Sequence, residues 1–110
     1  MAKVIFKRQV FPCRFQKLYH LSAAEIIKPV MGNMPLILVG GVRTLEDMET
    51  VLSEQKADFL SMSRPFIREP FLAKHLRQGR VKKASCTSCN KCFAAVFNGL
   101  RLRCYADGLP

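Results

Sequence analysis

The sequence predicts an α/β fold built on neighbouring parallel strands, and three observations support this prediction. Residues 35–39 (PLILV) form an apolar run without alternation, bounded by Pro35 and Gly40-Gly41, which is typical of a strand buried on both faces of a parallel sheet. Residues 58–62 (DFLSM) have the pattern of a second short strand. A helical pattern lies between them, and the order strand, helix, strand implies a right-handed crossover between parallel strands.

A helix is expected to precede the first strand, beginning near residue 21. Ser22 is placed to cap its N-terminus, and Glu25 would complete a capping box, while Leu21 and Ile26 occupy the positions of a hydrophobic staple. Pro29 should end or kink this helix, because proline lacks the backbone donor and collides with the preceding turn.

Two further helices follow the predicted strands. Thr44 and Asp47 form a second capping box at the start of the helix between the strands. Pro70 suits the first turn of another helix (FLAKHLRQ), and Gly79 is a natural C-terminal stop. The helix between the strands presents one apolar stripe to the sheet, made of Leu45, Met48, Val51 and Leu52.

The charge of the chain is strongly positive and uneven. The net charge is +10, and residues 71–110 carry eight Lys and Arg against the single acid Asp107. Such a field is used most often to neutralise phosphates, so it is compatible with nucleic acid, with an anionic cofactor or with a solvated surface. Charge alone does not choose among these.

The sequence favours a cytoplasmic location. No apolar run reaches the roughly 20 residues that a membrane-spanning helix needs. Residues 1–17 have neither the apolar stretch nor the cleavage site of a secretory signal. In a reducing compartment a framework of structural disulfides is not expected, although the chain has five cysteines.

The ends of the two predicted strands suggest an anion site. The first strand runs into Gly40-Gly41 and the second into Ser63-Arg64. Neighbouring parallel strands bring both ends to one edge of the sheet, where α/β proteins place their ligands. Two glycines let an anion approach the backbone closely, and Arg64 offers a forked, permanent charge suited to phosphate.

A cysteine cluster follows the last predicted helix. Cys86, Cys89, Cys92 and Cys104 have the pattern C-x2-C-x2-C-x11-C. Four thiolates suffice for tetrahedral zinc or for a [4Fe–4S] cluster. Three cysteines at successive two-residue gaps with a remote fourth are closer to ferredoxin-like ligation. Zinc and the absence of any metal remain alternatives. Cys13 lies far from this motif, and we expect it to be a small hydrophobe without a ligand role.

The aromatic residues and histidines near these motifs have the pattern of packing residues. His20 and His75 each lie beside apolar neighbours in a predicted helix. Four phenylalanines are expected to cover the base of the cysteine loop and not to form an exposed platform for nucleic-acid bases: Phe66, Phe71, Phe93 and Phe97.

Three segments together resemble the C-terminal end of the NADH:flavin oxidoreductases, the old-yellow-enzyme-like flavoproteins. They are PLILVGGVRTLEDMETVL, ADFLSMSRPFIREP, and CTSCNKC followed by LRCY, and the resemblance runs from about Leu18 to Tyr105. It is strongest to the iron–sulfur branch, which includes 2,4-dienoyl-CoA reductase and trimethylamine dehydrogenase. That branch carries a very similar cysteine run after its last barrel strand, with a third gap that can be one residue longer.

The resemblance implies a TIM barrel of which this chain holds strands seven and eight, with FMN bound at the strand ends. Residues 1–34 would be a basic lead-in and helix, residues 35–79 the βαβα end of the barrel, and residues 80–110 the cysteine-rich segment. The residues that would hold the FMN phosphate are Gly40, Gly41, Ser63 and Arg64. The cysteine segment would hold the [4Fe–4S] cluster that exchanges single electrons with flavin.

The resemblance also sets expectations about partners. A TIM barrel needs about 250 residues, so the remainder of the barrel must come from the same gene or from a separate subunit. NAD(P)H would be the reductant, with neither a membrane nor a nucleic acid as partner. The chain alone should be inactive and should self-associate through open sheet edges. The alternative function is a small zinc-binding module whose basic tail contacts nucleic acid.

Overall fold

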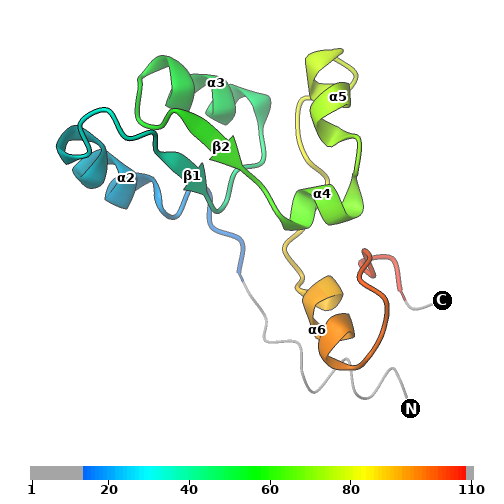
Figure 1. Ribbon diagram of the computed structural model, residues 1–110. Helices are drawn as coiled ribbons and strands as arrows, with labels where there is room; N and C mark the ends of the chain where they lie inside the picture. Colours follow the sequence, from blue (N-terminus) through cyan, green and yellow to red (C-terminus); the bar gives the residue numbers. More distant parts are fainter. Residues whose placement is uncertain (1–13, 109–110) are drawn as a thin grey trace.

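A computed structural model of the chain describes residues 14–108. Helices and strands alternate along the first two thirds of this range, and the last third is mostly loop around one short helix (Figure 1). In chain order the elements are α2 (Leu21–Ile27), the 3₁₀ helix η1 (Lys28–Val30), β1 (Ile37–Val39), α3 (Leu45–Ser53), β2 (Phe59–Ser61), α4 (Arg64–Arg68), α5 (Leu72–Arg77) and α6 (Lys91–Phe97).

The two strands pair in parallel, as the sequence predicts. Ile37 lies opposite Phe59, and Val39 lies opposite Ser61, while α3 makes the crossover between the strands. Both strands are shorter than the apolar runs that predict them. In the described residues the sheet therefore has two strands in one layer and does not close into a barrel.

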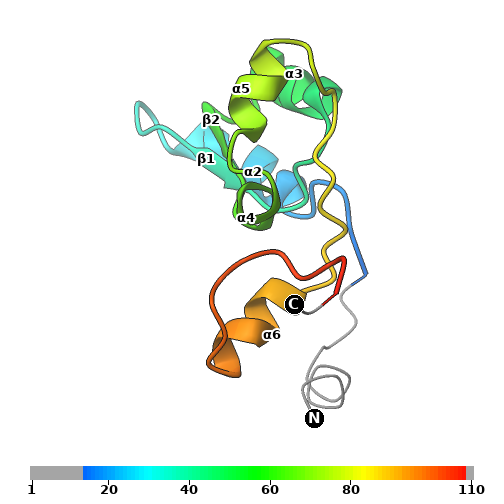
Figure 2. The same ribbon diagram turned by 90° about the vertical axis from the view of Figure 1, so that its right-hand side faces the viewer.

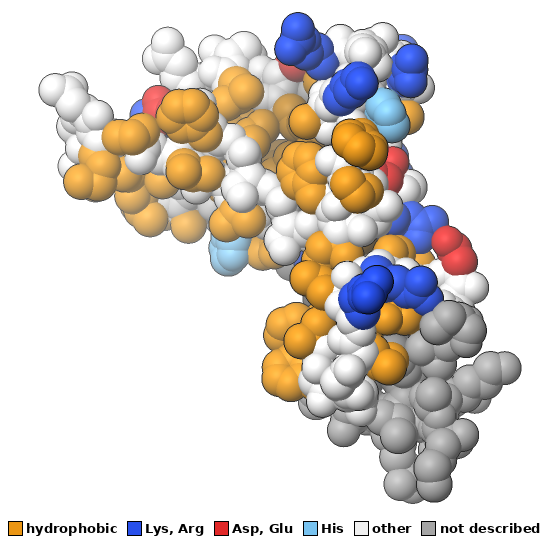
Figure 3. All heavy atoms as spheres, turned by 45° about the vertical axis from the view of Figure 1, so that its right-hand side comes forward, with side chains coloured by type: hydrophobic (Ala, Val, Ile, Leu, Met, Phe, Trp, Pro, Cys, Tyr) orange, Lys and Arg blue, Asp and Glu red, His pale blue; other side chains and the backbone are white. Residues whose placement is uncertain are grey.

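The prediction that residues 35–39 are buried on both faces is wrong for this chain. Leu38 is 3% exposed, but its neighbours Ile37 and Val39 are 59% and 49% exposed. Successive side chains of a strand point to opposite faces, so one face is covered and the other is open. Apolar side chains gather over the sheet side of the molecule in Figure 3. The open face has no covering layer among the described residues.

The covered face of the sheet holds a core between the helices. One buried cluster joins Leu38 of β1 to Ala24 of α2 and Val51 of α3. A second cluster lies between α3, α5 and the chain that leads to the cysteines, and consists of Val42, Met48, Leu72, Leu76 and Ala84. Helices α2 and α3 are thereby fixed to the sheet, and α5 is fixed to α3.

Helix α3 begins as predicted. The hydroxyl of Thr44 accepts a hydrogen bond from the backbone N–H of Asp47, which satisfies one of the free donors of the first turn. The Asp47 carboxylate pairs with Lys17 at 2.6 Å, which ties the N-terminal segment to this helix. Leu52 is 41% exposed, so the apolar stripe of α3 is narrower than predicted. Its buried part consists mainly of Met48 and Val51.

The predicted start of the first helix is wrong in detail. Helix α2 begins at Leu21, His20 is its N-cap, and no side chain caps it, so Ser22 lies inside the first turn. The preceding turn supplies backbone acceptors, because Leu21 N–H donates to Leu18 and Ala24 N–H donates to His20. Ile26 is 76% exposed and makes no hydrophobic staple. Pro29 does end this helix, since η1 follows directly.

Beyond β2 the chain contains a helix that the sequence did not predict. Helix α4 starts at Arg64 with Pro65 at its first turn, and α5 follows at Leu72 and stops before Gly79, whose φ is +69°. The cysteine segment with α6 lies beside α4 and away from α2 in both views (Figures 1 and 2). None of the helices in the described range is long and apolar enough to cross a membrane.

Most of the phenylalanines lie elsewhere than predicted. Phe71, Phe93 and Phe97 are 68%, 63% and 74% exposed, and only Phe66 packs partly against the core. Phe93 and Phe97 pack edge to face on the outside of α6. The buried side of α6 consists of small residues that meet Tyr105, so the three exposed phenylalanines do not form the predicted cover beneath the cysteine loop.

Candidate functional site

The ends of β1 and β2 form one hollow, and the four residues that the sequence predicts there all line it. Gly40 and Gly41 follow β1, and Ser63 and Arg64 follow β2. The hollow has a volume of about 80 Å³, which exceeds the space that one water molecule needs several-fold. We call it the strand-end hollow. Its lining also contains residues outside the predicted set, among them Tyr19 and Arg43.

The two glycines of the strand-end hollow are required by the backbone and by crowding. Gly40 has φ +111° and Gly41 has φ +69°, conformations that other residues seldom adopt. A Cβ on Gly40 would lie 2.6 Å from the ring of Tyr19. A Cβ on Gly41 would collide with the backbone of the segment that ends in Leu18, whose N–H donates to the Gly41 carbonyl at 3.1 Å. The N-terminal segment is therefore held against the strand end.

Arg43 is the charged residue that sequence reasoning missed. It is 5% exposed, and its guanidinium donates to the Val42 carbonyl at 2.7 Å and to the Ser88 hydroxyl at 2.6 Å. Its Nε is buried without a hydrogen-bond partner among the described residues. Burial lowers the pKa of Arg43, partly offset by the Cys86 sulfur, and the nearby charge of Arg64 lowers it further. The sequence did contain a signal for Arg43 as a site residue, because it is a basic residue two positions after the glycine pair that ends a predicted strand.

Arg64 connects the strand-end hollow with the cysteines. Its Nη1 donates a hydrogen bond to the side-chain carbonyl of Asn90, which lies between Cys89 and Cys92. Arg64 lines both the strand-end hollow and a second hollow beside the cysteine loop. The two predicted sites therefore lie next to one another and share a charged side chain, although Arg64 and Cys86 are 22 positions apart in the sequence.

All four predicted cysteine ligands line that second hollow, which we call the cysteine hollow. Cys86, Cys89, Cys92 and Cys104 are half-buried, and none of them forms a disulfide. The loop curls because Ser88 and Asn90 both have φ of +60°. Such left-handed residues turn the chain sharply, and asparagine tolerates them better than most. Three cysteines are thereby brought toward the remote fourth.

The charged side chains that line the cysteine hollow, Arg64 and Arg68, are positive. Arg68, the last residue of α4, donates a hydrogen bond to the Cys104 sulfur at 3.2 Å, and Arg43 Nη2 lies 4.0 Å from the Cys86 sulfur. The hydrogen bond to Cys104 raises the pKa of Arg68. Burial raises the pKa of the Cys92 thiol, and the neighbouring cysteines add to this rise. Donors and cations directed at sulfur stabilise thiolates.

The four thiols have the ligand number of a tetrahedral zinc ion and also that of a [4Fe–4S] cluster. Among residues 14–108, no group of three Cys, His, Asp or Glu side chains is close enough to hold one metal ion. Four sulfurs bound to one zinc at about 2.3 Å must lie within about 4 Å of each other. In a [4Fe–4S] cluster each cysteine binds its own iron, so the sulfurs stay farther apart. Neither arrangement is assembled among residues 14–108: the four half-buried thiols line one hollow of about 20 Å³, and their number suits both groups. Cys13 lies outside the described residues.

Comparison with known proteins assigns the chain to a protein family. Residues 2–83 match the NADH:flavin oxidoreductase / NADH oxidase family. An NADH oxidase of Thermoanaerobacter brockii is 40% identical over 96 residues, which cover 84% of this chain and 15% of that protein. A 4,4'-dithiodibutanoate disulfide reductase of Rhodococcus erythropolis is 31% identical over 94 residues, covering 84% of this chain and 23% of that protein.

A third relative matches a shorter region. An NADH-dependent flavin oxidoreductase of Talaromyces variabilis is 34% identical over 59 residues, covering 54% of this chain and 14% of that protein. No solved structure matches the chain significantly. The chain thus spans less than a quarter of the length of the relatives it matches. Because the family match covers most of the sequence, the chain belongs to the NADH:flavin oxidoreductase / NADH oxidase family.

Proposed function

We propose that this chain is the C-terminal portion of an FMN-dependent NAD(P)H oxidoreductase, similar to the ene-reductases and dienoyl-CoA reductases. In this proposal the chain contributes the contacts to the FMN phosphate and a [4Fe–4S] site for electron transfer. The observation that carries the proposal is Arg64, which lines the strand-end hollow and at the same time pairs with Asn90 of the cysteine loop. A flavin phosphate and a metal cluster would then have adjacent binding sites.

The strand-end hollow has the chemistry of a phosphate site. Gly40 and Gly41 line this hollow with backbone alone, and the guanidinium groups of Arg43 and Arg64 supply two positive charges. The buried Nε of Arg43 is a donor that still lacks an acceptor among the described residues. An arginine fork matches phosphate oxygens well. These residues would hold the phosphate end of FMN, while bound FMN supplies the hydride and electron chemistry.

The cysteine hollow supports the iron–sulfur assignment through the number and spacing of its thiols. A bound cluster would supply single-electron transfer beside the flavin. The four unpaired thiols also suit a reducing, cytoplasmic compartment. The alternative function is a zinc module that contacts nucleic acid. The exposure of Phe93 and Phe97 favours it, because exposed aromatic rings can stack on bases. The family match over residues 2–83 weighs against it.

The rest of the barrel would be the principal partner. Ile37, Val39 and Phe59 expose one face of the sheet, and a barrel strand has neighbours on both edges and layers on both faces. Further strands, from the same gene or from another subunit, would cover this surface. We propose that NAD(P)H reduces the flavin only in that complete assembly.

A spectrum of anaerobically reconstituted protein tests the proposal. The chain is incubated with iron and sulfide, desalted, and analysed for iron, zinc and visible absorbance. We expect a brown, dithionite-bleachable chromophore with about four irons per chain, the content of one [4Fe–4S] cluster. A colourless protein with one zinc per chain would instead support the alternative function. FMN binding is measured separately in the complete barrel, so the two cofactor assignments can fail independently.

A further inference from the structure

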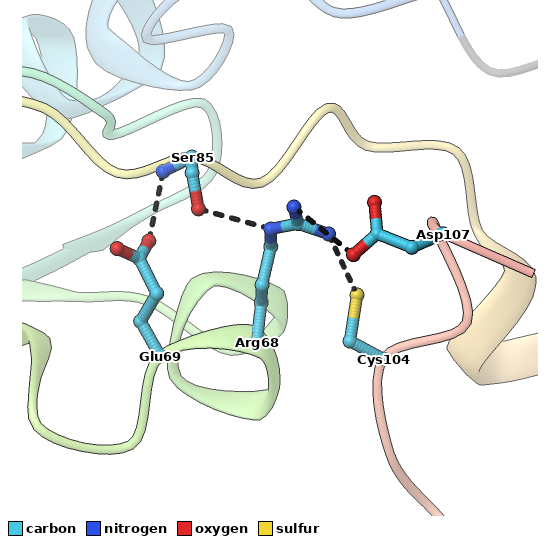
Figure 4. Close-up of polar contacts among 5 residues, drawn as sticks. All are labelled: Arg68, Glu69, Ser85, Cys104 and Asp107. Carbon is cyan, nitrogen blue, oxygen red and sulfur yellow. Dashed lines mark hydrogen bonds and ion pairs between the residues drawn. The ribbon is translucent and has the colours of Figure 1, made fainter.

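Arg68 reaches from the barrel end of the chain to the fourth cysteine. It is the last residue of α4, and all three nitrogen atoms of its guanidinium have partners (Figure 4). Nε donates to the Ser85 hydroxyl at 2.9 Å, Nη1 donates to the Cys104 sulfur at 3.2 Å, and Nη2 lies 3.5 Å from an Asp107 carboxylate oxygen. One side chain therefore links α4 to both ends of the cysteine segment.

The guanidinium is held in a fixed orientation. Glu69, the next residue, accepts a hydrogen bond from the Ser85 N–H at 2.8 Å. This contact fixes Ser85, whose hydroxyl accepts the hydrogen bond from Arg68 Nε (Figure 4). The planar fork of arginine then determines where its other donors point. Asp107 is 88% exposed in its side chain, so its ion pair adds little energy. The Ser85 contact is thus the main constraint that directs Nη1 at the sulfur.

The contact to Cys104 differs from the other arginine contact at the cysteines. Arg43 Nη2 lies 4.0 Å from the Cys86 sulfur and already donates to Ser88 at 2.6 Å. Arg68 Nη1 lies 3.2 Å from its sulfur, a normal distance for a hydrogen bond to the larger sulfur atom. Among the described residues, Arg68 makes the shortest cation-to-sulfur contact.

We propose that Arg68 is the positioning residue that holds Cys104 toward the cysteine hollow and raises the reduction potential of the iron–sulfur centre. This inference depends on the proposed function. A bound cluster would supply one-electron chemistry: reduced flavin or dithionite would lose one electron to it, and the negative charge on the cluster and its sulfurs would increase. A cationic N–H donor on a sulfur stabilises the reduced form more than the oxidised form, and hydrogen bonds to sulfur are known determinants of cluster potential.

Arg68→Gln and Arg68→Lys in the reconstituted full chain test this inference, with Arg77→Gln of α5 as the control. Arg77 is an exposed arginine of similar charge that lies outside the lining of the cysteine hollow. The measurements are iron content and a dye-mediated redox titration followed by visible absorbance. We expect iron content to be retained and the one-electron reduction equilibrium of Arg68→Gln to fall at least tenfold, which is about 59 mV. Arg68→Lys should fall less, because it keeps the charge but loses the fork.

The outcomes separate this inference from the proposed function. If the unmodified chain binds no iron, the cluster assignment and the inference fall together. If it binds iron and both Arg68 variants titrate like Arg77→Gln, only the inference is overturned. Should Arg68→Gln fail to fold or to hold iron, the potential of Arg68→Lys decides: a lowered value supports the inference, and an unchanged value overturns it.

Discussion

The buried guanidinium of Arg43 donates a hydrogen bond to the hydroxyl of Ser88, with 2.6 Å between Nη2 and Oγ. The two residues are 45 positions apart in the sequence, and each is almost fully buried. Arg43 follows the end of β1, and Ser88 lies between the first two cysteines of the loop. The contact therefore fixes the cysteine loop to a residue that lines the strand-end hollow.

Ser88→Ala should destabilise the chain by about 1–3 kcal/mol, because a buried charged donor loses its acceptor. Alanine keeps the Cβ, so the strain of the left-handed backbone at this position stays the same. Urea unfolding followed by circular dichroism measures the change. Thr87→Ala, an exposed neighbour, is the matched control, and equal stability of the two variants would mean that the Arg43–Ser88 contact contributes nothing.

Arg64→Ala should weaken FMN binding by about 1.5–3 kcal/mol, the scale of one charged hydrogen-bonded contact. The measurement needs the complete barrel and a fluorescence titration of flavin. Arg80→Ala changes the net charge equally at an exposed position away from the strand-end hollow, and serves as the control. An unchanged FMN affinity in Arg64→Ala would mean that Arg64 does not bind the phosphate and that its role is structural, through its contact with Asn90 of the cysteine loop.

Replacing any one of Cys86, Cys89, Cys92 and Cys104 by serine should abolish or sharply reduce bound iron, because a missing thiolate opens the coordination of one metal. Cys13→Ser should leave the iron content unchanged. Iron and sulfide analysis of each reconstituted variant gives the answer. If metal survives in Cys104→Ser at the level of the unmodified chain, the fourth ligand is another group.

Asp58→Asn should lower stability at neutral pH but not in acid. The Asp58 carboxylate accepts from the Leu36 N–H at 2.7 Å and pairs with Lys28, and these contacts, the backbone hydrogen bond first, lower its pKa. A lowered folded-state pKa means that the stabilisation is present above the unfolded value, about 3.9, and is lost as pH falls through the folded value.

Urea midpoints of Asp58→Asn and the unmodified chain, measured from pH 7 to pH 2.5, check this sign. The two curves should converge below about pH 4, where the native carboxylate is being neutralised. Glu49→Gln, at an exposed position of α3, should follow the unmodified chain at every pH. A gap that stays constant down to pH 2.5 would show that the charge of Asp58 does not stabilise the fold.

The chain by itself should self-associate and should lack flavin-dependent turnover. Ile37, Val39 and Phe59 are about half exposed or more on one face of the sheet, and within residues 14–108 both strands have an open edge. Size-exclusion chromatography with light scattering, followed by addition of FMN and NADH under anaerobic conditions, tests both parts. A monodisperse monomer that binds FMN stoichiometrically and bleaches it with NADH would contradict this prediction.

The local elements were readable from the sequence because their signals are local. The apolar runs of β1 and β2, the Thr44 cap of α3 and the stop at Gly79 depend on residues within a few positions of each other. The sequence predicted that Gly40, Gly41 and Arg64 lie close together, because neighbouring parallel strands end on the same edge of the sheet. The four cysteines followed from their spacing, and all line one hollow.

Only the tertiary structure decided which side chains meet across long stretches of chain. The contacts Arg43–Ser88, Arg64–Asn90 and Arg68–Cys104 join residues 45, 26 and 36 positions apart. No periodicity or spacing rule encodes them, because each depends on where α4 and the cysteine loop pack against the strand ends. The exposure of Val39 and Phe97 was equally unreadable, since an apolar side chain is buried only where another part of the protein supplies a surface to cover it.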